Sequence, residues 1–81
     1  MLPFDLDEVS IDVSKHFRNT WMRKWDWDQV DLREAIRATH RVSRVGKNKW
    51  KLFVRKRGEK KLVIVYEAGP GEVFVITGSE G

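Results

Sequence analysis

Cysteine is absent from this sequence of 81 residues. Its absence excludes disulfides, thiolate nucleophiles, iron–sulfur clusters and zinc sites built on cysteine. The chain must therefore be stabilised by packing alone. A protein without cysteine fits a reducing compartment, so we expect a cytoplasmic location.

Patterns for several other kinds of chemistry are missing too. No acidic residues stand with histidine at the spacing of metal ligands, and the glycines form no phosphate-binding loop. No serine carries a local nucleophile signature. We therefore predict no bound metal and no cofactor.

Long hydrophobic runs are also lacking. The longest unbroken apolar run covers residues 62–66, whereas a membrane-spanning helix needs about 20 apolar residues. The first residues show neither the basic nor the apolar region of a secretory signal. The sequence thus predicts a protein that neither spans a membrane nor is secreted.

The chain is rich in large aromatic side chains. Four Trp, four Phe and one Tyr provide bulky groups for a core that is otherwise thin at this length. We expect one domain over residues 1–81, with an ordered core from about residue 9 to residue 78.

Positive charge is concentrated in the middle of the chain. All sixteen Lys and Arg lie between Lys15 and Lys61, a stretch with only five acids, while the remaining residues include seven acids. Such segregation favours a surface that attracts polyanions over an evenly solvated one.

Hydrophobic periodicity predicts the elements. Alternation at residues 9–13 indicates a short strand or an extended entry, and Ser14 is a plausible N-cap for a helix whose apolar stripe is Phe17, Trp21 and Trp25. Asp26, with Gln29 three residues later, is expected to cap a second helix that reaches about Thr39.

Period-two patterns and glycine-containing turns follow. They predict strands at 41–45, 49–57, 61–67 and 72–77, with the third strand central because it is the most continuously apolar. The expected fold is α+β: two N-terminal helices packed on one face of a four-stranded antiparallel meander.

The strand at 49–57 is the most informative segment. Alternation sends Trp50, Leu52 and Val54 toward the helices and leaves a basic row with one aromatic ring on the other side. This composition is typical of single-stranded RNA recognition, where phosphates meet cations and bases stack on rings. The expected contacts are Lys49, Lys51, Phe53, Arg55 and Arg57, together with Arg41 and Arg44, and further positive charge comes from Lys47, Lys60 and Lys61.

The same strand has a simpler interpretation. Lys and Arg also protect an exposed strand from pairing with other chains, and Phe53 would then pack on a cross-strand neighbour.

Two histidines lie beside arginines. A histidine could take the 2′-hydroxyl proton of RNA while a guanidinium stabilises the phosphorane, with no metal required. His16 is followed by Arg18, and His40 by Arg41. His16 could equally be a surface residue, and His40 a favourable cation at a helix C-terminus.

A resemblance to a known family rests on the order of the elements and on two local features. These are the segment 14–18 (SKHFR) and, after it, Arg23 with a short break at 25–30. The chain resembles the small RelE/BrnT-type toxins, and in particular an uncharacterised toxin-like family with this fold order, β-α-α-β-β-β-β. The likeness spans about residues 9–78.

The resemblance implies a function as well as a fold. It implies metal-independent cleavage of messenger RNA and an antitoxin partner that covers the active face. The candidate catalytic residues that it implies are His16, Arg18 and Arg23 on the first helix and Arg55 on the sheet.

Two functions therefore remain open. The first is an RNA-interacting domain, as a passive binder or as a metal-independent endoribonuclease. The alternative is a non-catalytic protein-interaction module that docks an acidic partner on its basic face. Oligomeric state is left open by the sequence.

Overall fold

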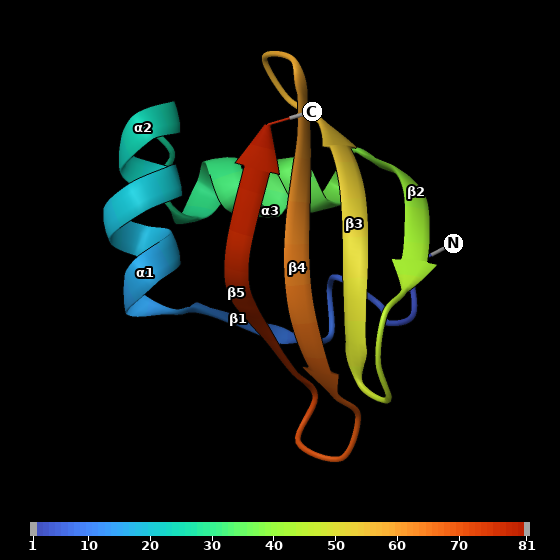
Figure 1. The fold of residues 1–81 in the computed structure, drawn as a ribbon. Coiled ribbons are helices and arrows are strands. Elements are labelled where there is room, and N and C mark those ends of the chain that lie inside the picture. The colour runs from blue at the N-terminus through green and yellow to red at the C-terminus, as the bar shows by residue number, and fades with distance from the viewer. Residues whose placement is uncertain (1, 81) are drawn as a thin grey trace.

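The computed structural model describes residues 2–80. These residues form a small α+β domain with one five-stranded mixed sheet in the order β1-β5-β4-β3-β2 (Figure 1). The elements in chain order are β1 (Ser10–Val13), α1 (Lys15–Phe17), η1 (Arg18–Met22), α2 (Arg23–Trp25), α3 (Gln29–Arg37), β2 (Thr39–Arg44), β3 (Lys49–Arg55), β4 (Glu59–Glu67) and β5 (Glu72–Glu80).

The predicted four-stranded antiparallel meander is wrong, because β1 joins the sheet as a fifth strand. It pairs in parallel with β5, and the backbone N–H groups of Ser10 and Ser14 donate to the carbonyls of Gly71 and Val75, each at 2.9 Å. The alternation at residues 9–13 was therefore that of a true strand. Its pairing covers an edge of β5 that would otherwise expose unpaired backbone groups.

The other four strands pair antiparallel in chain order, and β4 lies at the centre of the sheet. Short turns connect them, which forces neighbouring strands to run in opposite directions. The central place of β4 agrees with its continuous apolar sequence.

The first helical region is not a regular α-helix. Ser14 caps it as predicted, since its Oγ accepts from the N–H of Phe17 at 2.9 Å. The π-helical segment η1 then widens one turn, so the buried positions are Phe17, Met22 and Trp25. Trp21, expected in the apolar stripe, is displaced by one position and is only partly buried.

The cap of α3 also differs from the prediction. Asp26 has a left-handed backbone (φ 58°) and ends α2. Asp28 caps α3 instead, and its side chain and that of Asp31 each accept from the other residue's backbone N–H, at 2.9 and 3.0 Å. The break between the two helical regions is thus two residues longer than expected.

Both helical regions pack on the same face of the sheet, which we call the covered face. Figure 1 shows α3 crossing behind the strands and α1 and α2 beside β5. Gly78 allows this approach, because a Cβ there would lie 2.9 Å from the Trp25 ring and 3.0 Å from the Phe17 ring. Fully buried residues of the covered face include Leu52, Val54, Leu62, Ile64 and Val75.

Within residues 2–80 no helix has the length and apolar character needed to cross a membrane.

Candidate nucleic-acid interface

The face of the sheet opposite the helices, which we call the open face, carries side chains in cross-strand rows. Strand register defines three rows, each read from β2 to β5. They are Arg41, Phe53, Lys61 and Ser79; then Ser43, Lys51, Val63 and Thr77; then Val45, Lys49, Val65 and Phe74. The pair Arg55 and Glu59 precedes the first row.

The first row places an aromatic ring between two cations. The guanidinium carbon of Arg41 lies 5.1 Å from the ring centroid of Phe53, and Lys61 Nζ lies 5.9 Å from it. Phe53 is half-buried, whereas its neighbours Leu52 and Val54 are fully buried. The predicted alternation of β3 is therefore confirmed, and the ring lies on the uncovered side of the sheet.

The rest of the open face is apolar in the middle and acidic at its far end. Val63 and Val65 are half-buried, and the side chains of Phe74 and Val45 remain 40% and 48% exposed. Beyond them Glu67 pairs with Glu72 across β4 and β5. Positive charge thus runs along β3 with two cations in the first row, whereas these acids lie at the β4–β5 turn.

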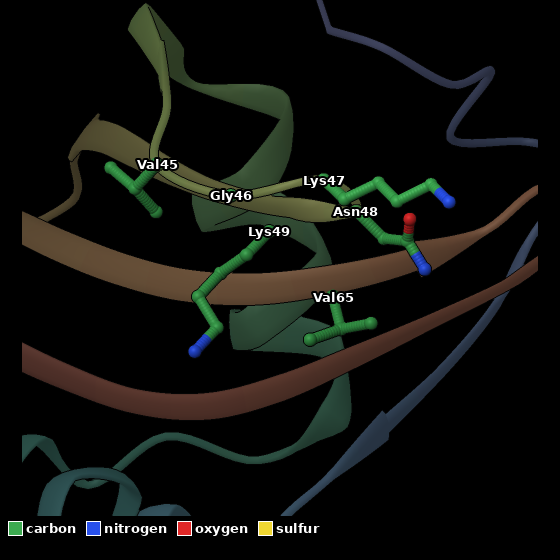
Figure 2. Close-up of a pocket in the computed structure, with 6 residues that line it drawn as sticks. All are labelled: Val45, Gly46, Lys47, Asn48, Lys49 and Val65. Carbon is green, nitrogen blue, oxygen red and sulfur yellow. The ribbon is translucent and has the colours of Figure 1, made fainter.

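A shallow hollow lies at the β2–β3 turn. Its volume is about 400 Å³, and its lining residues are Val45, Gly46, Lys47, Asn48, Lys49 and Val65. Figure 2 shows Val45 on one side of the turn and Lys47 and Asn48 on the other, with Lys49 and Val65 below them. Because Val45, Lys49 and Val65 share a row, the hollow continues the open face.

Four cations of the open face lack carboxylate partners in the part of the chain that the structure describes. Within the described residues, no acid lies within 4 Å of the charged groups of Arg41, Lys49, Lys51 or Lys61. Such charges keep their attraction for an external polyanion, because no internal anion neutralises them.

Several predicted contacts do not reach the open face. Arg44 pairs with Trp50 and donates to the carbonyls of Gly46 and Lys47 at 3.1 and 2.5 Å, so it stabilises the turn. Arg57 lies 3.9 Å from Asp31 of α3.

Lys60 also turns away from the open face. It is 6% exposed, and its ammonium lies over the Trp25 and Trp27 rings at 5.5 and 5.9 Å. Strand alternation with Leu62 and Ile64 predicts this inward direction.

The four candidate catalytic residues are not brought together. His16, Arg18 and Arg23 are exposed on the helical region that packs against β5 on the covered face. Arg55 projects from the open face, where it pairs with Glu59. Between residues 2 and 80, no hydrogen bond or ion pair joins any two of the four.

Arg55 belongs instead to a cluster that includes the second histidine. The Nε2 atom of His40 lies 3.0 Å from Glu59 Oε2, and Arg55 Nε donates to the other oxygen of the same carboxylate. The hydrogen bond from Arg55 lowers the pKa of Glu59 most, and the one from His40 lowers it further, whereas partial burial raises it; the net effect is a pKa below the ordinary value. Nothing in the spacing of residues 40, 55 and 59 signals this contact, which depends on strand register.

The structure holds no group of His, Cys, Asp or Glu suited to a metal ion within the part of the chain that it describes. Comparison of the chain with protein-family models, curated proteins and solved structures finds no match. The resemblance to RelE/BrnT-type toxins thus stays a prediction.

Proposed function

We propose that the protein binds single-stranded RNA on the open face of its sheet. The observation that carries this proposal is the row in which Phe53 lies between Arg41 and Lys61. A half-buried ring on a sheet offers a stacking surface for a base, and guanidinium planes stack on bases as well. The flanking cations are then placed to meet the phosphates on either side.

Charge supports the same proposal. Lys49 and Lys51 continue the positive surface along β3, and neither has an acidic partner within 4 Å among the described residues. A polyanion gains from such charges by releasing its condensed counterions. The acidic pair Glu67 and Glu72 lies at the far end of the sheet, and Glu67 accepts from Asn48 of the hollow at 3.3 Å, so the expected path of the RNA strand follows the first two rows.

Unpaired bases fit this surface better than a duplex does. An open sheet face presents rings to bases that are already unstacked, whereas paired bases in A-form RNA keep their faces hidden. Bases of a single strand are therefore the expected contacts, with little sequence preference from stacking alone.

The test is fluorescence anisotropy with a labelled single-stranded RNA of about 12 nucleotides. Phe53→Leu keeps an apolar side chain without a ring, and we expect it to weaken binding by about 5- to 150-fold. Lys51→Gln should reduce the slope of log K against log salt by about 0.7, as expected for one lost phosphate contact.

Arg23→Gln is the matched control, because Arg23 is an exposed cation on the helical side that has no acidic partner within residues 2–80. It should leave the salt slope unchanged. The proposal is overturned if the RNA does not bind at low salt, or if Arg23→Gln weakens binding as much as Lys51→Gln. If polyglutamate competes fully and Phe53→Leu has no effect, the open face binds an acidic protein instead.

A further inference from the structure

The direction of the His40 side chain is set by a β-bulge in β2. Between Thr39 and Arg41 the register of β2 and β3 shifts by one residue, and His40 is the extra residue. A β-bulge of this kind re-aims a side chain. Here the imidazole reaches across β3 to Glu59 on β4.

The carboxylate of Glu59 fixes the imidazole by one nitrogen. His40 Nε2 is 3.0 Å from Glu59 Oε2, and within residues 2–80 no protein group forms a hydrogen bond with Nδ1. The side chain of His40 is 35% exposed, so the imidazole is partly open to solvent. A base held by a carboxylate on one nitrogen and free on the other is the arrangement of a general base with an orienting group.

Arg55 completes the cluster. Its Nε donates to Glu59, which leaves the remaining N–H donors of the guanidinium free within the described part of the chain, and its side chain is 70% exposed. A guanidinium with free donors in this position suits a phosphate oxygen.

A buried lysine supports the turn that carries Arg55 and Glu59. Lys60 Nζ donates to the carbonyls of Lys56 and Arg57 at 2.9 and 2.7 Å. Arg57 has a positive φ of 55°, a strained conformation for a residue with a side chain. The turn is thus held in one shape from the covered face.

We propose that His40, Glu59 and Arg55 form a metal-independent site for RNA phosphodiester transfer at the end of the open face. This proposal rests on RNA binding by the open face. The cluster directly precedes the row of Arg41, Phe53 and Lys61, and Phe53 lies about one strand repeat, roughly 7 Å, from Arg55. A base stacked on Phe53 therefore brings the phosphate next to it within reach of the cluster.

The reaction balances without another reactant. His40 Nδ1 takes the proton of the 2′-hydroxyl, whose oxygen attacks the adjacent phosphorus as the bond from phosphorus to the 5′-oxygen breaks. The imidazolium then gives that proton to the departing 5′-oxygen. Arg55 stabilises the charge on the phosphorane oxygens, and Glu59 acts as a positioning residue that stabilises the imidazolium. The products are a 2′,3′-cyclic phosphate and a 5′-hydroxyl.

The experiment incubates the purified chain with single-stranded RNA in the presence of a metal chelator and identifies both product ends by mass spectrometry. We expect cyclic phosphate and 5′-hydroxyl ends. His40→Ala should lower the cleavage rate by about 100-fold or more with the dissociation constant for RNA changed less than about 3-fold. Free imidazole should restore part of the rate, which a merely structural role of His40 would not permit.

His16→Ala is the matched control, because His16 is the other exposed histidine and lies on the helical region. It should cleave at the wild-type rate. Glu59→Gln should lower kcat by about 10- to 100-fold without weakening RNA binding, as expected for lost positioning of the imidazole.

The outcomes separate this proposal from the proposed function. RNA binding without cleavage overturns the site and leaves the binding face standing, whereas loss of both binding and cleavage removes both. Cleavage that survives in His40→Ala, or that is lost in His16→Ala, overturns the assignment of the base. A substrate with 2′-deoxy sugars should bind without being cut, and its cleavage would contradict the 2′-hydroxyl mechanism.

Discussion

The two faces of the sheet use the same kind of residue for opposite purposes. Two cations that face the helices have partners: Lys56 lies 2.7 Å from Glu34 and 3.5 Å from Asp31, and Lys60 donates to turn carbonyls. On the open face Lys51 and Lys61 have no acid within 4 Å among the described residues. The cations of β3, β4 and the turn between them are therefore divided into those that stabilise the fold and those that are free for binding.

The largest expected loss of stability comes from a substitution in the core of the covered face. Leu62 is fully buried at the centre of the sheet, and Leu62→Ala should lower the free energy of unfolding by about 2–5 kcal/mol, through lost burial and the cavity left behind. Val63→Ala, one residue along and on the open face, should cost about 1 kcal/mol or less. Urea unfolding followed by tryptophan fluorescence measures both, and equal losses would show that the open face is itself buried in solution.

A smaller effect is expected at the buried ammonium. Lys60→Met retains the apolar part of the side chain but removes the donors to the carbonyls of Lys56 and Arg57, which should lower the free energy of unfolding by about 1–3 kcal/mol. Lys61→Met should change stability by less than about 0.5 kcal/mol and weaken RNA binding instead. If the two neighbouring lysines exchange these effects, the assignment of the faces is wrong.

Much of this division could be predicted from the sequence. Alternation placed Phe53 opposite Leu52 and Val54, and the continuous apolar run marked β4 as central. The same alternation shows that Lys60 points inward with Leu62. The prediction that Lys60 adds to the binding surface was therefore wrong, and the sequence pattern already indicated this.

Other features depend on contacts that no local pattern encodes. The parallel pairing of β1 with β5 joins segments about sixty residues apart along the chain. Arg57 faces α3 because the turn puts it in a left-handed conformation. The contact of His40 with Glu59 needs both a bulge in β2 and the register of two strand pairs, and the sequence-based choice of His16 as the active histidine could not have anticipated it.

The smallest expected effect is a pH dependence at the covered face. Hydrogen bonds from Lys24 Nζ at 2.9 Å and Trp25 Nε1 at 3.1 Å lower the pKa of Glu80 below its ordinary value of 4.5. The pKa of Glu80 is lower in the folded state than in the unfolded state. The ionised carboxylate therefore contributes to the free energy of unfolding above pH 4.5, and this contribution is lost as pH falls through the folded pKa. Wild-type unfolding should therefore become easier on acidification, and less steeply so in Glu80→Gln. Lys24→Met should also reduce the pH dependence of stability. Urea unfolding between about pH 5 and about pH 3 measures it for each variant. If both variants follow the wild-type curve, the pair of Lys24 and Glu80 does not contribute to stability.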